Sequence, residues 1–250
     1  MQFFYYIWKS KIQKMTENSQ LNQILFLDIE TVPQTAEYAQ LPEKTRSLWD
    51  KKAAKLFQHE DETPQSIYSR AGIYAEFGKI ICIVVGYFYD HQFRVKSFAG
   101  DDEAQLLRDF GQMLEGFQQR KEAKLCGHNA KEFDFPYICR RMIIHRIPIP
   151  AILNASGKKP WETSFLDSMD LWRFGDYKSY TSIDLLTTIF GIQTPKDDID
   201  GSMVYDYYWH RNELDTIVKY CKKDVVAVAQ VYLRLQNLEP ISETQIIDAD

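Results

Sequence analysis

The stretch FLDIETVP, residues Phe26 to Pro33, is the most informative part of this chain. It closes an unbroken apolar run that begins at Ile24, which predicts a strand covered on both faces. Because side chains alternate along a strand, Asp28 and Glu30 project from the same face. Two carboxylates held together in apolar surroundings cost free energy unless a positive group lies near them. A divalent cation is the simplest group that meets this need.

The composition is that of a globular protein. The chain has 250 residues, of which 45% are hydrophobic and 14% aromatic, enough to bury a substantial core. Four cysteines, at positions 82, 126, 139 and 221, form no CxxC pair, so we expect reduced core thiols instead of disulfides or a zinc cluster. The aromatic run Phe3–Trp8 is too short to span a bilayer or to form a signal sequence. We therefore expect a cytoplasmic protein that does not associate with membranes.

The net charge does not exclude a nucleic acid as substrate. The formal charge is −5, whereas proteins that bind nucleic acids are usually basic. A site built from several carboxylates contributes negative charge of its own, and two bound divalent ions would change −5 to about −1. The overall charge therefore argues only weakly against a polyanionic substrate.

Alternating strand and helix patterns predict a mixed α/β fold. After the first strand, short apolar runs predict strands at 79–89, 92–98, 124–128 and 165–171. Helical spacing and capping residues predict helices at about 102–117, 134–144, 182–190 and 211–236. These elements predict a mixed, five-stranded central sheet with helices on both faces.

The chain is expected to form a single domain, since no repeat, low-complexity tract or interdomain linker interrupts it. Residues 21–238 would form this domain, with a charge-rich helical insertion at about 33–78. We expect residues 1–20 to be an N-terminal extension and residues 239–250 to be a C-terminal tail.

A second polar motif stands at the end of a predicted strand. In GHNAKEFDFP, residues 127–136, the strand delivers His128 and Asn129, and the next helix begins near Asp134. Strand ends in α/β sheets are where ligands gather. His128 alone is more typical of a histidine whose hydrogen bonds are satisfied within the fold than of a metal ligand. Asn129 alone could simply close a turn.

A third motif lies on the last predicted helix. In YCKKD, Tyr220 and Asp224 are four residues apart, so their side chains stack on one face of the helix. That face flanks the apolar stripe of the helix, which places both groups at the edge of the core. A charge without a role would be expected further toward solvent.

The three motifs together resemble the DEDD superfamily of 3′-to-5′ exonucleases, in the version with tyrosine in the third motif. DIET, HN-x3-FD and Y-x3-D stand in the family's order, and the similarity is to the bacterial group likened to the proofreading domain of family-B DNA polymerases. It covers roughly residues 24–235 and implies the ribonuclease-H-like fold. Because no polymerase module follows, we expect an exonuclease that acts alone.

The resemblance implies two divalent metal ions, Mg²⁺ or Mn²⁺, which prefer carboxylate oxygens and can activate water for phosphodiester hydrolysis. By this resemblance, Asp28 bridges both ions, Glu30 and Asp224 hold the ion that activates water, and Asp134 supports the other. Tyr220 would orient the attacking water. It would be a poor general base, because an unperturbed phenol has a pKa near ~10.

The resemblance also suggests substrate contacts, since the position of Asn129 approaches the terminal nucleotide in the family. We expect Thr31, Asn129 and Phe133 to contact the substrate. Phe133 could do so by stacking on an unpaired base, and Phe135 and Trp172 are further candidates for such stacking.

The expected function is release of nucleoside monophosphates from the 3′ end of single-stranded DNA or RNA. Two alternatives remain at this stage: a catalytically inactive nucleic-acid-binding module on the same fold, and a structure-specific endonuclease of that fold. An intact carboxylate set argues against the first, because unneutralised acids repel a polyanion. The tyrosine and aspartate spacing on the last helix argues against the second. The sequence does not identify a protein partner.

Overall fold

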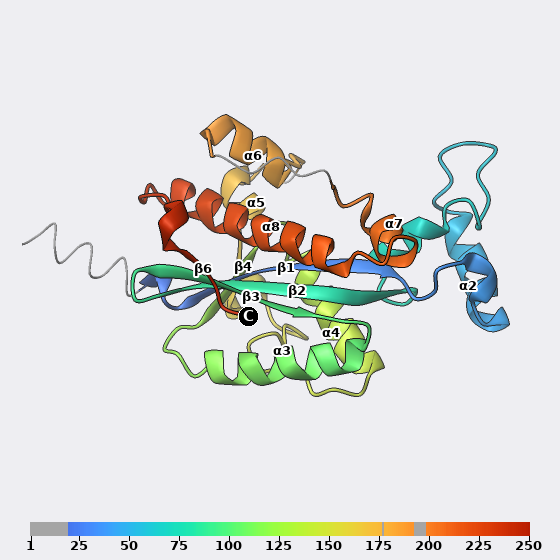
Figure 1. Cartoon of the computed structure of the whole chain (residues 1–250), viewed down its shortest axis with the longest axis horizontal. Coiled ribbons are helices and arrows are strands. Elements are labelled where there is room, and N and C mark those ends of the chain that lie inside the picture. Colours follow the sequence, from blue (N-terminus) through green and yellow to red (C-terminus); the bar gives the residue numbers. More distant parts are fainter. Residues whose placement is uncertain (1–19, 177, 193–198) are drawn as a thin grey trace, which may run out of the picture.

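A computed structural model describes residues 20–176, 178–192 and 199–250. Except for Gln20, the expected N-terminal extension at 1–20 lies outside the described residues. Three layers are visible in Figure 1, with a central sheet between two groups of helices. Every helix in the described part of the chain is too short or too polar to cross a bilayer.

The centre of the molecule is a mixed sheet of six strands in the order β5-β4-β1-β2-β3-β6. The strands are β1 (Ile24–Pro33), β2 (Gly78–Tyr89), β3 (Gln92–Ala99), β4 (Lys124–Gly127), β5 (Phe165–Asp167) and β6 (Ile246–Asp248). β2 is antiparallel to β1 and β3, whereas β4 is parallel to β1 and β5, and β6 is parallel to β3.

The prediction of five strands is wrong by one. The sixth strand, β6, comes from the segment expected to be a tail, and it pairs with β3 from Phe93 to Val95. Its three residues, Ile-Ile-Asp, are too few to show a strand period in the sequence. Pairing with an existing sheet edge, and not local propensity, makes this segment extended.

Helices lie on both faces of the sheet (Figure 1), and those at 103–117, 134–144, 183–190 and 214–235 follow the predicted patterns. The helices are α2 (Glu43–Ala53), α3 (Glu103–Phe117), α4 (Asp134–Ile144), α5 (Ser168–Arg173), α6 (Ile183–Phe190), α7 (Val204–Trp209) and α8 (Leu214–Leu235). Short 3₁₀ turns are η1 (Tyr38–Gln40), η2 (Tyr68–Ile73), η3 (Pro160–Glu162) and η4 (Glu243–Gln245). The strand predicted at 165–171 ends early, because the Asp167 side chain accepts the N–H of Met169 and starts α5.

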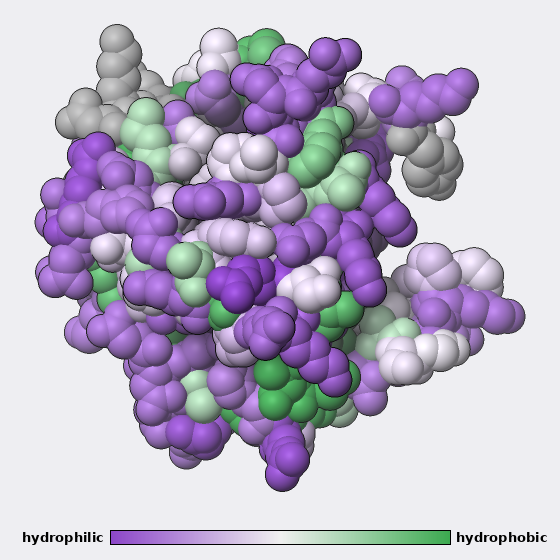
Figure 2. Space-filling view, turned by 90° about the vertical axis from the view of Figure 1, so that its right-hand side faces the viewer, coloured by the Kyte–Doolittle hydropathy of each residue, from purple (hydrophilic) through white to green (hydrophobic). Residues whose placement is uncertain are grey.

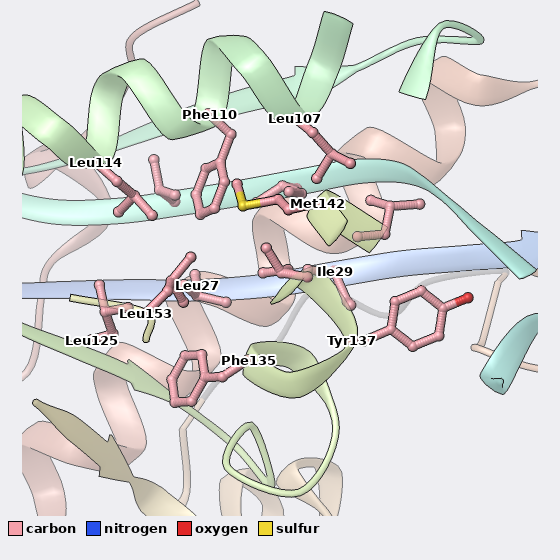
Figure 3. Packing of buried hydrophobic residues seen from close by; sticks show 14 of the residues in the cluster. Leu27, Ile29, Leu107, Phe110, Leu114, Leu125, Phe135, Tyr137, Met142 and Leu153 are labelled. Carbon is pink, nitrogen blue, oxygen red and sulfur yellow. The ribbon is translucent and has the colours of Figure 1, made fainter. Parts of the chain in front are cut away.

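Alternation along β1 separates two cores. Leu25, Leu27 and Ile29 are buried in the core formed with α3 and α4, which Figure 3 shows from close by. Phe26 faces the opposite side, in the core formed with α8. Because β1 contributes to both cores, it is buried on both faces, as the apolar run at its start predicts.

The segment between β1 and β2 has a small core of its own. Trp49 of α2 is fully buried, and its Nε1 donates a hydrogen bond of 2.8 Å to the carbonyl of Pro64. Tyr68 and Phe77 pack edge-on against the Trp49 ring. α2 lies at one end of the molecule, beyond the sheet (Figure 1), and this end is mostly hydrophilic on its surface (Figure 2).

Candidate active site

Strand β1 presents Asp28 and Glu30 toward α8. Both residues share the phase of Phe26, which is buried beneath α8, whereas Leu27 and Ile29 are buried beneath α3 and α4. Glu30 is only 8% exposed, and Asp28 is partly buried. The alternation of β1 therefore holds two carboxylates close together on the α8 side of the sheet.

The ladder between β1 and β2 is interrupted immediately after Glu30. Glu30 pairs with Cys82 and Thr31 pairs with Ile80, which leaves Ile81 without a counterpart on β1. This β-bulge lets two consecutive residues of β2, Ile81 and Cys82, both face the side of α7 and α8. Bulges are common next to active sites, where they re-aim side chains. Here the bulge adds the apolar side chain of Ile81 to the α7 and α8 side of the sheet, next to Glu30.

Helix α4 begins at Asp134, which is only 4% exposed. Its Oδ1 accepts a hydrogen bond of 3.1 Å from the backbone N–H of Ile29. β4 ends at Gly127 and pairs with β1 only as far as Phe26, so the Asp134 carboxylate takes the place of a strand partner between the two β1 carboxylates. Burial, reinforced by the charge of Asp167, raises the pKa of Asp134 to about 7.

Helix α8 contributes three side chains to the site, those of Tyr220, Cys221 and Asp224. Cys221 is fully buried, and its thiol donates to Oδ2 of Asp28 at 3.4 Å. Tyr220 and Asp224 lie one turn apart on the same face of α8. Burial, followed by the negative charges of Asp224 and Glu30, raises the pKa of Tyr220 far above its ordinary value. The phenol is therefore protonated at neutral pH.

The carboxyl groups of β1 lie in an environment that opposes their ionisation. Burial raises the pKa of both Asp28 and Glu30 well above the ordinary range. The next causes are the charges of Asp134 and Asp224 for Asp28, and of Asp28 and Asp224 for Glu30. The charged residues that act most strongly on these carboxyls are thus other acids. The structure brings Asp28, Glu30, Asp134, Tyr220 and Asp224 into one site.

The donor atoms of this site fit a hard divalent cation. Ligand atoms of Asp28, Glu30 and Cys221 all lie within 4.8 Å of one another. Burial holds the pKa of the Cys221 thiol well above its ordinary value, so the thiol remains a hydrogen-bond donor to Asp28 and does not compete as a thiolate ligand. Carboxylate oxygens remain, and these are the ligands that Mg²⁺ and Mn²⁺ prefer.

Asn129 follows β4 in a left-handed conformation, with φ of 59°. Its backbone N–H donates to Oδ1 of Asp167 at 2.9 Å, and the N–H of Lys131 donates to Oδ2 of Asp167 at 3.0 Å. The side-chain Oδ1 of Asn129 is buried and has no hydrogen-bond partner among the described residues. A buried acceptor without a partner is costly, and a substrate donor would satisfy it.

Asp167 is the functional residue that the sequence analysis does not identify. It is 2% exposed at the end of β5, and it fixes the turn that leads from β4 to Asp134. A signal exists, because FLD occurs both at 26–28 and at 165–167, each time as an acid after apolar residues of a strand. Only the pairing of β4 with β5 reveals that this acid meets Asn129.

His128 is hydrogen-bonded within the fold, as expected. Its Nδ1 lies 2.9 Å from Oγ of Ser168, and its Nε2 lies 2.8 Å from the carbonyl of Thr181. Burial lowers its pKa. It therefore connects the end of β4 to the segment between α5 and α6.

Two of the expected substrate contacts, Thr31 and Phe133, lie close to Tyr137, and their contact with a substrate stays a prediction. Thr31 is near the phenol of Tyr137, which donates to the carbonyl of Gly72 at 2.6 Å and belongs to the core beneath α3 and α4. Phe133 is partly buried, with its ring centroid 5.4 Å from that of Tyr137.

The expectation that Phe135 stacks on a base is wrong. It is 1% exposed and lies 4.3 Å from Phe165, because the first turn of α4 packs this side chain into the core. Trp172 is partly buried and packs edge-on against Phe190.

Comparison with known proteins supports the resemblance to 3′-to-5′ exonucleases. A family described as "Predicted 3'-5' exonuclease related to the exonuclease domain of PolB" matches residues 73–246. This match contains Asn129, Asp134, Tyr220 and Asp224, and it begins after the β1 carboxylates. No curated protein matches the chain.

The fold is similar to that of the family B DNA polymerase from the hyperthermophilic archaeon Pyrobaculum calidifontis, with a TM-score of 0.52 and 15% sequence identity. The similarity covers 84% of this chain and 24% of the polymerase chain, so the chain spans about a quarter of the polymerase. The ribonuclease-H-like fold, with a mixed sheet and helices on both faces, is thereby confirmed. From its match over well more than half of its length, the chain belongs to the family of predicted 3′-to-5′ exonucleases related to the exonuclease domain of PolB.

Proposed function

We propose that the chain is a metal-dependent exonuclease that releases nucleoside monophosphates from the 3′ end of single-stranded DNA or RNA. The observation that carries this proposal is the cluster of Asp28, Glu30 and Asp134 beside Asp224, in which neighbouring acids raise the pKa of Asp28 and Glu30. Such a cluster is unfavourable by itself and becomes favourable when cations bind.

Asp28, Glu30, Asp134 and Asp224 would hold two divalent ions, Mg²⁺ or Mn²⁺. When bound, these ions would supply a strong nucleophile from water at neutral pH and relieve charge on the leaving 3′ oxygen. Asp134 is already fixed by the N–H of Ile29, so its carboxylate is positioned before a ligand arrives. Cys221 restrains Asp28 in the same way from α8.

Tyr220 would orient the attacking water. Its phenol stays protonated at neutral pH, because burial and the neighbouring acids raise its pKa. It can therefore donate or accept a hydrogen bond and is a poor general base. Asp224, one turn further along α8, lies close enough for its charge to raise the pKa of the phenol.

Asn129 would contact the terminal nucleotide. Its buried Oδ1 has no partner among the described residues and can accept a hydrogen bond from a hydroxyl group. Asp167 holds the Asn129 backbone in place from β5. This division separates residues that contact the substrate from residues that position them.

The test is hydrolysis of DNA and RNA oligonucleotides labelled at either end, with Mg²⁺, Mn²⁺ or EDTA. We expect successive shortening from the 3′ end that EDTA abolishes and that Asp28→Asn removes. Glu43→Gln, which changes an exposed acid on α2, is the matched control and should leave the rate unchanged. Tight binding without cleavage would instead support an inactive binding module, and internal cuts would support an endonuclease.

A further inference from the structure

The segment between α5 and α6 exposes two aromatic side chains. Phe174 is 88% exposed, more than any other large hydrophobic side chain among the described residues, and Tyr180 is 67% exposed. Aromatic rings usually bury most of their surface, because leaving them in water is unfavourable. Two such rings on one short segment therefore require an explanation other than packing.

The backbone at Phe174 is held in an uncommon conformation. Phe174 ends α5 with φ of 45° and ψ of 35°, in the left-handed region, where glycine is the usual residue. A bulky residue in this conformation is strained, and such strain is concentrated at functional sites. A glycine would end the helix at lower cost.

A hydrogen bond joins the two sides of the segment. Nε of Arg173 donates to the carbonyl of Ser179 at 2.8 Å, which closes the loop that carries Phe174. The side chain of Arg173 is only 9% exposed, so this restraint is largely protected from water. This contact joins the residue before Phe174 to the residue before Tyr180, so the two aromatic residues follow backbone positions that are tied together.

The same segment is attached to the candidate active site. Nε2 of His128 lies 2.8 Å from the carbonyl of Thr181, directly after Tyr180. His128 precedes Asn129 in the turn that leads to Asp134. α5 and α6 also lie on the α8 side of the sheet, the side that Asp28 and Glu30 face (Figure 1). The exposed rings thus belong to the same side of the molecule as the carboxylates.

We propose that Phe174 and Tyr180 form a stacking surface for unpaired bases of the strand whose 3′ end enters the carboxylate site. This inference rests on the proposed function and names its substrate class as single-stranded nucleic acid. Aromatic rings bind successive bases by stacking and accept any base, because every base has a π-face. Paired bases are already stacked within a duplex, so the surface favours unpaired ends.

The first test is binding in EDTA, which measures the stacking surface without requiring hydrolysis. Fluorescence anisotropy with a labelled single-stranded 15-mer should show that Phe174→Ala with Tyr180→Ala weakens binding by about thirtyfold or more, the loss expected when two bases no longer stack. Trp161→Ala is the matched control. Trp161 is 77% exposed and lies on η3, which precedes β5. The segment that carries Phe174 and Tyr180 instead follows α5.

A second variant separates stacking from a structural role. Phe174→Gly removes the ring and relieves the left-handed backbone, so its thermal midpoint should be unchanged or higher while binding is weakened. Phe174→Trp should retain binding. Unchanged binding in the double variant, or an equal loss in Trp161→Ala, would overturn the proposal.

Hydrolysis separates this proposal from the proposed function. If the wild-type protein shortens the 15-mer, the double variant should raise KM with little change in kcat, and a dinucleotide should be cleaved equally by both proteins. Absence of hydrolysis by the wild-type protein would contradict the proposed function, while the binding measurement would still decide on the stacking surface.

Discussion

Two buried groups of charged residues lie on opposite sides of the sheet, and they are built differently. On the side of α3 and α4, Glu103 is 5% exposed and accepts from Nε of Arg141 at 2.8 Å and from the N–H of Ile80 at 2.7 Å. Its other oxygen lies 2.7 Å from Nε2 of His145. On the side of α8, Asp28 and its neighbours face other acids.

The pKa values follow from this difference. Burial opposes ionisation of Glu103, but the hydrogen bonds and charge of Arg141 outweigh it and lower the pKa of Glu103. Burial raises the pKa of Asp28 and Glu30, and neighbouring acids raise it further. The first group is neutralised within the chain, whereas the acids of the second group face one another and would be stabilised by protonation or by a bound cation.

The largest effect is expected when an acid of the second group, on the α8 side of the sheet, is replaced. Asp28→Asn should lower the rate of hydrolysis by about a thousandfold or more, because even outer partners of a metal site are worth 10–100-fold. The free energy of unfolding should not fall, since one source of repulsion disappears. Single-turnover hydrolysis and urea unfolding measure the two effects. If Asp28→Asn also lowered the free energy of unfolding enough to account for the lost activity, Asp28 would be a structural residue.

The next largest effect is expected when the first group, on the side of α3 and α4, loses the cation that pairs with Glu103. Arg141→Met should lower the free energy of unfolding by about 3–5 kcal/mol, because Glu103 would remain buried without its cation. Arg140→Met, at the exposed neighbouring position, is the control and should change stability little. Urea unfolding at neutral pH compares the two variants. Equal stability of both variants would contradict the structural role of the pair.

The two groups should also depend on pH in opposite directions. Asp134 has a raised pKa of about 7, so its contribution to stability is present at low pH and is lost as pH rises toward 7, by up to about 4 kcal/mol. The lowered pKa of Glu103 gives a contribution that is lost as pH falls through the carboxyl range.

Thermal unfolding in EDTA from pH 5 to pH 8 tests the contribution of Asp134. We expect the midpoint to fall as pH rises and Mg²⁺ or Mn²⁺ to restore it. Asp134→Asn should flatten this dependence. A midpoint in EDTA that rises between pH 5 and pH 8 would contradict the assignment.

The smallest expected effect concerns Tyr220. Tyr220→Phe should lower kcat by about tenfold, the value of roughly one hydrogen bond, and should leave KM nearly unchanged. Its loss should stay well below that of Asp28→Asn in the same assay. Equal losses in these two variants would mean that the phenol does more than orient water.

Local patterns predict the strand positions of Asp28 and Glu30, because period-two alternation needs no knowledge of distant residues. Resemblance predicts that Asp134 and Asp224 join them. The bulge beside Glu30 was not predictable, since it arises from the pairing of β1 with β2. The role of Asp167 was hidden for the same reason, because it depends on a three-residue strand.

Pairing also explains the other differences. β6 becomes a strand only because β3 offers an edge. Phe135 has the composition of a stacking residue, yet the direction of α4 turns it toward Phe165. Sequence periodicity predicts which face a residue occupies within its own element. It does not predict which neighbour that face meets.

β6 has a consequence for handling the protein. It covers the edge of β3, and Nζ of Lys222 on α8 contacts Asp248 at 2.7 Å and Asp250 at 2.6 Å. Truncation before Ile246 would expose a bare ladder that can recruit another copy, so shortened versions should aggregate. It would also release Lys222, which lies between Tyr220 and Asp224 in the sequence. Affinity tags at this end therefore need a spacer.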